Sequence, residues 1–219
     1  MKEKSFFYDI LEFLRNTIGY FLIIFPIILI VFDGRALLAQ INWQIDNWFS
    51  NTNQNRINLS SSEVDYLISQ APQTEQNEAR VIIPKINVNA PIVFPQTIDN
   101  DELLSYLEKG VIHYRDSAEI GKPGTAIILG HSSAYPWYNG NYGSVFALLE
   151  KLEIGDEFVV SYQNKKYYYR VSEKDIVVPL DFKVEEKDNK SHLILMSCWP
   201  VRTNRLRMVI NSDLIRVED

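Results

Sequence analysis

The sequence contains a single cysteine and three histidines, and it has no stretch rich in lysine and arginine. One cysteine cannot form an internal disulfide, and no Cys/His pair has metal-ligand spacing, so a disulfide scaffold and a zinc module are both excluded. The 22 basic and 28 acidic residues give a net charge of −6, which argues against a nucleic-acid-binding protein. Internal repeats and low-complexity blocks are also lacking, and we expect no metal and no cofactor.

The chain does contain enough apolar material for a folded core. Of its 219 residues, 46% are hydrophobic and 23% are charged, which is the balance of an ordinary globular protein and excludes a largely disordered chain. This length predicts one globular domain with additional segments attached to it.

The longest uncharged run covers residues 18–32, IGYFLIIFPIILIVF. It is shorter than the ~20 residues of a typical membrane span. An apolar stripe at helical spacing continues beyond it, however, and Trp43 and Trp48 suit a membrane–water boundary. We therefore predict a transmembrane helix with a juxtamembrane extension over residues 18–49, preceded by a cytoplasmic segment, 1–17.

The charges around this run predict its orientation. Lys2, Lys4 and Arg15 precede the run and only Arg35 closely follows it, so the positive-inside rule places the N-terminus in the cytoplasm. We expect a single-pass protein of the cell membrane, in contact with membrane lipid, whose downstream part is extracytoplasmic. A cleaved secretory signal and a buried core helix are the alternatives.

Beyond the helix the composition changes twice. Residues 50–77 are mostly polar and predict a stalk. Residues 78–219 contain short segments rich in Val, Ile and Tyr between Gly, Pro and Asn, the pattern of an all-β barrel or sandwich. Two short helices are expected within it: one where Asp99 and Glu102 form a capping box, and one at VFALLEKL after Ser144.

Two candidate catalytic groups follow apolar strands. Cys198 comes after LILM, and His131 comes after AIILG, so both stand at strand ends, where scaffolds present reactive groups. A nearby imidazole activates a thiol for acyl transfer and can then protonate a departing amine. Taken alone, each residue is more often structural, because a lone cysteine is usually buried in the core as an unreactive packing residue. His113 and His192, which lie within or before apolar strands, are interpreted as structural.

Arg205 and Arg207 alternate with apolar residues in the last predicted strand, RLRMVI, which puts both guanidiniums on one face. A fixed guanidinium can stabilise the oxyanion of a tetrahedral intermediate. The loop at residues 132–143, SSAYPWYNGNYG, either forms a mobile groove wall or packs its aromatic side chains on the barrel.

Taken together, the outer segments resemble the sortases, a family of membrane-anchored cysteine transpeptidases. The resemblance covers residues 79–217 and rests on RVIIPKINVNAPIV, GVIHYRDSAEIGKPGTAIILGHSS, FALLEKLEIGDEFVV, YYYRVSEKDIVVP and LILMSCWP followed by RLRMVI. The family's TLxTC motif falls on residues 194–198, with Ile194 and Ser197 where threonines are usual. An alignment without gaps puts Arg207 at the catalytic arginine, and a shorter loop would select Arg205.

The resemblance implies a closed eight-stranded sortase-type β-barrel with short helices. It also implies that Cys198, His131 and Arg207 act on surface proteins with an LPxTG-like C-terminal sorting signal. The acyl group would pass through a thioacyl-enzyme to an amine of a cell-wall cross-bridge or a pilin lysine. The family's calcium site matches no motif here. Two competing hypotheses are a catalytically inactive surface β-domain that binds wall polymer or a partner protein, and a cysteine protease that only hydrolyses.

Overall fold

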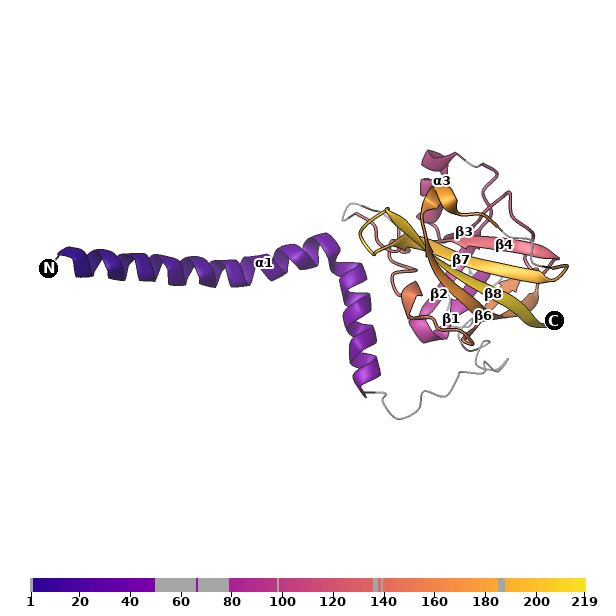
Figure 1. Cartoon of the computed structure of the whole chain (residues 1–219), viewed down its shortest axis with the longest axis horizontal. Coiled ribbons are helices and arrows are strands. Elements are labelled where there is room, and N and C mark those ends of the chain that lie inside the picture. The colour runs from indigo at the N-terminus through magenta and orange to yellow at the C-terminus, as the bar shows by residue number, and fades with distance from the viewer. Residues whose placement is uncertain are drawn as a thin grey trace.

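The structure, a computed structural model, describes residues 2–49, 66, 79–97, 99–135, 138, 140–184 and 188–219. The stalk predicted over residues 50–77 lies outside these residues, Tyr66 apart. Figure 1 shows two parts, a long N-terminal helix and a β-barrel that contains the C-terminus.

Eight strands of the described residues close into a barrel in the order β1-β2-β3-β4-β7-β8-β6-β5, which confirms the predicted closed eight-stranded barrel. Most neighbours are antiparallel, but β2 pairs with β3, and β4 with β7, in parallel. The strands are β1 (Arg80–Ile83), β2 (Val88–Val93), β3 (Val111–His113), β4 (Gly124–Leu129), β5 (Glu157–Tyr162), β6 (Lys165–Val177), β7 (Ser191–Trp199) and β8 (Leu206–Glu218).

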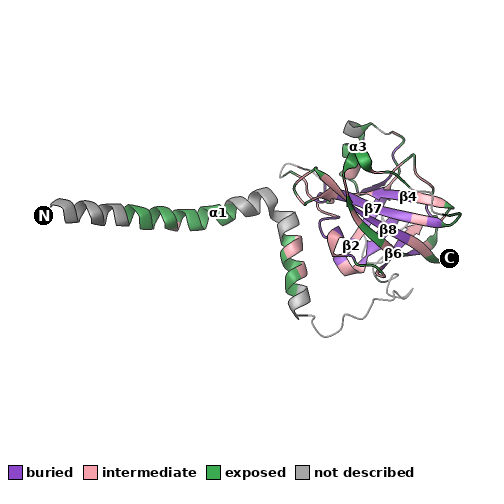
Figure 2. Ribbon diagram, viewed as in Figure 1, coloured by how far each residue is buried: buried purple, intermediate pink, exposed green. Residues whose placement is uncertain are grey.

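The barrel interior is filled by one large apolar cluster, and the buried strands stand out in Figure 2. Strand alternation sends every second side chain of β4, β7 and β8 into this interior. The inward residues include Ile128, Leu195 and Ile210, each fully buried. The residues between them face outward, so each of these three strands has an inner face in the core and an outer face on the outside of the barrel.

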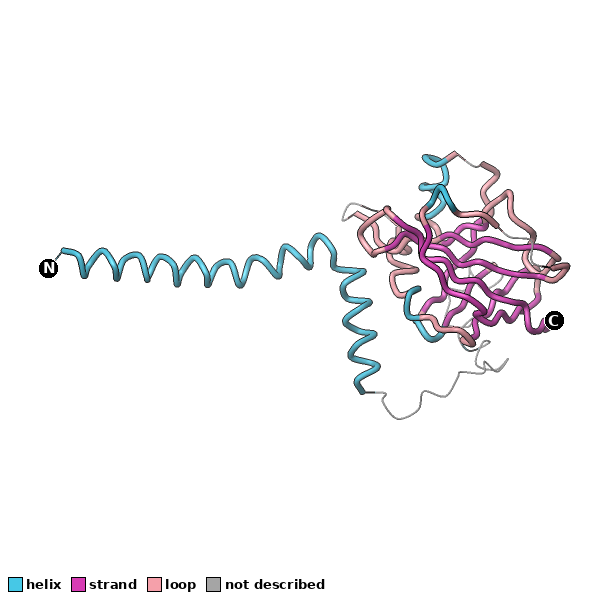
Figure 3. The backbone as a smooth tube through the Cα atoms, viewed as in Figure 1, coloured by secondary structure: helices cyan, strands magenta, loops and turns pink. Residues whose placement is uncertain are grey.

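Short helical segments lie at the periphery of the barrel, as Figure 3 shows. Half of the predicted capping box is present: the backbone N–H of Glu102 donates to Asp99 Oδ1 at 3.2 Å, and helix α3 (Asn100–Leu107) follows. The Asp99 N–H donates to Thr97 Oγ1 at 3.0 Å and not to the Glu102 carboxylate. The prediction that VFALLEKL forms one helix was wrong. That segment forms turns and the 3₁₀ helix η3 (Leu149–Lys151), which point Phe146, Leu149 and Leu152 into the core. The other 3₁₀ helices are η2 (Pro84–Ile86) and η4 (Pro179–Asp181).

The N-terminal part is one helix, α1 (Lys2–Phe49), which contains Pro26 and is drawn in Figure 1 as two arms that meet at a bend. In the part of the chain that the structure describes, no helix combines the length and the apolar character needed to cross a bilayer. Side chains 28–32 of the uncharged run lie outside that description, so the predicted span over 18–49 stays a prediction.

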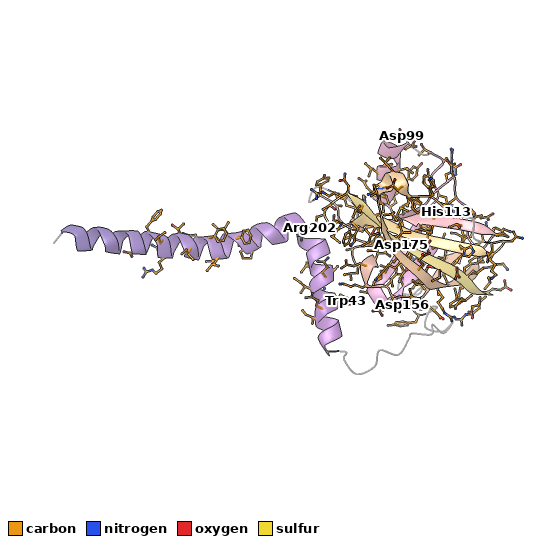
Figure 4. The ribbon with its side chains drawn as sticks, viewed as in Figure 1. Trp43, Asp99, His113, Asp156, Asp175 and Arg202 are labelled. Carbon is orange, nitrogen blue, oxygen red and sulfur yellow. The ribbon has the colours of Figure 1, made fainter. Side chains whose placement is uncertain are left out.

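The second arm of α1 contacts the barrel. Ala39 and Trp43 pack against the edge of the main core cluster, and Lys151 Nζ lies 4.8 Å from the centre of the Trp43 ring. Trp43 is labelled on this arm in Figure 4. A cation over an indole face is an attractive contact, so Trp43 and η3 join the helix to the barrel.

Candidate active site

Cys198 and Arg207 are direct partners in the antiparallel pair of β7 and β8. Paired residues in adjacent strands project from the same face of a sheet, with Cβ atoms about 4.5–5.5 Å apart. Both belong to the outward set, because Met196 and Val209, two residues away on each strand, are also paired and pack outside the barrel. The structure therefore brings these two predicted site residues together.

His131 comes from the neighbouring strand on the other side of β7. Leu129 of β4 pairs with Met196 in the parallel ladder, and Gly130 N–H donates to the Met196 carbonyl at 3.0 Å. His131 lies two residues beyond Leu129, as Cys198 lies two residues beyond Met196. In the extrapolated register His131 is therefore level with Cys198, two residues past the end of β4.

The three groups are partly buried and chemically available. Cys198 is a half-buried free thiol. Burial lowers the pKa of His131, which favours the neutral imidazole, and among the described residues neither ring nitrogen has a hydrogen-bond partner. Arg207 Nη1 donates to the carbonyls of Asn204 and Leu206, both at 3.0 Å. These bonds hold the guanidinium at the end of β8 through one of its nitrogens.

An apolar patch extends from this row of residues along the outer face of β4, β7 and β8. Four buried side chains form it, and partly buried neighbours, among them Val177 and Phe182, pack around it. Val177, Phe182 and Asp175 also line a cavity of about 380 Å³ next to the patch. The four buried members are Ile127, Ile194, Met196 and Val209. We call these four the outer patch.

The loops around the thiol are tied to one another. The backbone N–H of Arg202, which precedes β8, donates to Ser133 Oγ at 2.9 Å, and Figure 4 labels Arg202 at the rim of the barrel that faces α1. Trp199, next to Cys198, donates from Nε1 to Glu150 Oε2 at 3.2 Å. The loops after His131 and Cys198 therefore form one connected rim.

The other candidate residues have different places. Arg205 precedes β8, so the alternation expected to align it with Arg207 does not reach it.

The His113 ring donates from Nε2 to the Ala118 carbonyl at 2.9 Å and is buried, and burial lowers its pKa. His192 is held by Asp188 and Asp213, each 2.8 Å from one ring nitrogen. These contacts agree with the structural interpretation of both histidines. Within the described ranges, no group of acidic, His or Cys side chains could hold a metal ion.

Two features of the site were missed by the sequence interpretation. The outer patch was hidden because β4 and β7 are apolar on both faces, so LILM shows no alternation. The contact between the Tyr138 and His131 rings, with centroids 5.4 Å apart, joins a loop residue to a strand end. The only sequence signal for it was the aromatic content of the loop. Of that loop, residues 136, 137 and 139 lie outside the described residues, and Tyr135 is exposed.

A closed barrel with a thiol, an imidazole and a guanidinium at the ends of three adjacent strands has the groups that a cysteine-dependent acyl transferase needs. The comparisons with known proteins agree with that class. Residues 81–215 match the family model of the Sortase domain. The chain therefore belongs to the sortase family, a family of cysteine transpeptidases.

Two relatives show how far the similarity extends. Sortase D of Bacillus subtilis is 32% identical over 130 residues, 59% of this chain and 58% of the relative. Sortase A of Bacillus anthracis is 26% identical over 136 residues, 62% of this chain and 59% of the relative. The matches thus span about three fifths of the length of each relative.

Solved structures of sortases share the fold. Sortase A from Corynebacterium diphtheriae superposes with a TM-score of 0.54 at 22% identity, over 84% of this chain and 83% of that one. Sortase C1 from Streptococcus agalactiae gives a TM-score of 0.53 at 23% identity, over 82% of this chain and 89% of that one. At these identities the likeness concerns the fold alone.

Proposed function

We propose that the protein is a transpeptidase that cleaves an LPxTG-like C-terminal sorting signal and transfers the resulting acyl group to an amine. The observation that carries this proposal is the row formed by His131, Cys198 and Arg207 on adjacent strands, at the end of an apolar outer patch. The substrates would be surface proteins, and the acceptor would be a cell-wall cross-bridge or a pilin lysine.

The chemistry follows from the three groups. Cys198 Sγ attacks the substrate carbonyl, a C–S bond forms, and the C–N bond to the leaving segment breaks. His131, neutral at rest, takes the thiol proton as Cys198 attacks and then, as its cation, gives that proton to the departing amine. Arg207 pairs with the carbonyl oxygen as negative charge develops on it, through the nitrogens that do not hold Asn204 and Leu206. In the second step His131 takes a proton from the incoming amine, which displaces the thiol.

The outer patch supplies a surface for the peptide that precedes the scissile bond. An extended peptide advances about 3.3 Å per residue, so four residues reach from the thiol across the patch toward Phe182. The four members of the outer patch are themselves at most 7% exposed, so the accessible apolar surface there would come from their partly buried neighbours, among them Val177 and Phe182. Burying Leu and Pro side chains on such a surface is favourable by about 25 cal/mol per Å².

Membrane anchoring through α1 belongs to the same proposal. Between residues 18 and 27 the described side chains of α1 are uncharged and mostly apolar, and several of them, including Phe21, Leu22 and Ile23, are more than half exposed. A helix that is apolar all round is stable only when something covers it. Lipid would cover it, and the barrel would then lie on the outer side, with tethered substrates and wall acceptors. Protease protection in sealed vesicles tests this topology.

The direct test uses the full chain and a library of sorting-signal peptides, with hydroxylamine or oligoglycine as the amine. We expect an amine-trapped acyl product, a covalent adduct on Cys198 in mass spectra, and neither with Cys198→Ala. Hydrolysis without a trapped product would identify a protease instead. Failure of a small alkylating agent to label Cys198 before denaturation would favour a catalytically inactive binding domain.

A further inference from the structure

Tyr138 is in contact with His131 and comes from the loop that follows it. The two ring centroids are 5.4 Å apart and the planes meet at 89°, the edge-to-face arrangement that ring quadrupoles favour. Among the described residues, no hydrogen bond holds the imidazole nitrogens. Within the described residues, the Tyr138 ring is therefore a contact that can restrain the orientation of the imidazole.

The Tyr138 ring is itself held firmly. Its hydroxyl donates to the Leu107 carbonyl at the end of α3, at 2.6 Å. Two buried glycines leave it the space it needs, because a Cβ on Gly140 or on Gly143 would lie 2.7 Å or 3.0 Å from a ring carbon. The backbone N–H of Tyr138 donates to the Tyr135 carbonyl at 2.9 Å. A ring anchored at both ends is a rigid support for another ring.

We propose that Tyr138 is a positioning residue for His131: its ring fixes the imidazole beside Cys198, and its hydroxyl fastens that ring to α3. This inference rests on the proposed function, since it assigns His131 a proton-transfer role that depends on orientation. A group held in the reactive geometry reacts far faster than one that must find it, and a displacement of about 1 Å can cost a hundredfold in rate.

The same contact also limits access of water to the imidazole. Burial lowers the pKa of His131, and the Tyr138 ring covers part of the imidazole. Removing the ring would hydrate the imidazole and move its pKa back toward the ordinary value. A residue that merely stabilised the loop would have no such effect, so this change separates positioning from a general structural role.

The test compares Tyr138→Leu and Tyr138→Phe in the full chain. The protein has three histidines, so NMR titration can follow the imidazole of His131 separately, with His131→Gln used for its assignment. For Tyr138→Leu we expect the His131 midpoint to rise, kcat with a sorting-signal peptide to fall about tenfold to a hundredfold, and KM to change little. Tyr138→Phe retains the ring and should keep the midpoint, with a smaller loss of kcat.

Tyr135→Ala is the matched control, because its side chain is 72% exposed in the same loop. The proposal is overturned if Tyr138→Leu leaves the His131 midpoint where it was, or if kcat falls only as far as the folded fraction falls. It is also overturned if Tyr135→Ala reproduces both effects. If the wild-type chain processes no peptide at all, the proposed function fails, while the titration still tests the contact.

Discussion

Arg207 lies directly opposite Cys198 across β7 and β8, and Arg205 lies before the strand begins. Direct cross-strand pairing puts the Arg207 side chain on the same face of the sheet as the sulfur, and the carbonyls of Asn204 and Leu206 hold its guanidinium. A carbonyl carbon bonded to that sulfur would carry its oxygen within reach of the Arg207 side chain. The pairing of β7 with β8 thus fixes the strand position of Arg207, the proposed oxyanion partner.

Arg207→Ala should lower kcat/KM by about 10²–10³-fold, the usual effect of removing one oxyanion donor. Arg207→Lys should restore only part of this loss, because an ammonium cannot reproduce the forked geometry of a guanidinium. Arg205→Ala is the control and should leave steady-state transpeptidation almost unchanged. A larger loss of kcat/KM for Arg205→Ala than for Arg207→Ala would show that the residue paired with Cys198 is not the one that stabilises the oxyanion.

Phe182→Ala should weaken substrate binding, since Phe182 packs beside the outer patch and lines the adjoining cavity. We expect KM for a sorting-signal peptide to rise about tenfold with little change in kcat, because the lost apolar contact is made equally before and during reaction. Leu180→Ala, at a side chain that is 93% exposed, provides the comparison. Equal effects of the two variants would argue that the peptide binds elsewhere.

Gly130→Ala should disturb the strand end that presents His131. A Cβ at Gly130 would lie 2.5 Å from Phe146 Cδ2, and Phe146 is 1% exposed and donates its N–H to the His131 carbonyl. We expect the free energy of unfolding to decrease by about 1–3 kcal/mol, as in overpacked cores, together with a lower kcat. Denaturant titration measures the first quantity. Gly19→Ala, where nothing lies within 4 Å of an added methyl, should leave the barrel transition where it is.

Stability should decrease as the pH falls from about 7 to about 5. Burial lowers the pKa of His113 and of His131 in the folded protein, so in this range the unfolded chain binds more protons than the folded one. The stabilisation is complete above the ordinary histidine pKa and is lost as the pH falls through the lowered values. His113→Gln should reduce this pH dependence in thermal unfolding. An unchanged slope would mean that His113 is not desolvated in the fold.

Much of the barrel could be predicted from the sequence, and the exceptions have physical causes. Alternation and punctuation predict most strands, but β6 (Lys165–Val177) is long, and its pairing with β8 is irregular between Val171 and Glu173. A bulge interrupts the two-residue period and imitates a strand end. At VFALLEKL, burial of Leu149 and Leu152 in the barrel outweighed helix propensity.

The site was predictable only in part, for a related reason. Cys198 and His131 stand at strand ends, which local patterns reveal, and the strand register then places them side by side. Tyr138 reaches His131 through a loop, and no periodicity specifies a loop. Its role depends on a hydrogen bond to α3, more than thirty residues earlier in the chain.

Neighbouring residues of β7 face opposite sides of the barrel wall, so the closure of the barrel determines which side chain is outside. Ser197 is buried and faces inward, while Cys198 faces outward. Sliding β7 by one residue against its neighbours would bury the sulfur and present a hydroxyl in its place. Because β7 is bonded on both sides within a closed ring of strands, such a slip would require the ring to open. Circular closure therefore keeps the thiol of Cys198, the proposed nucleophile, on the outer face of the barrel.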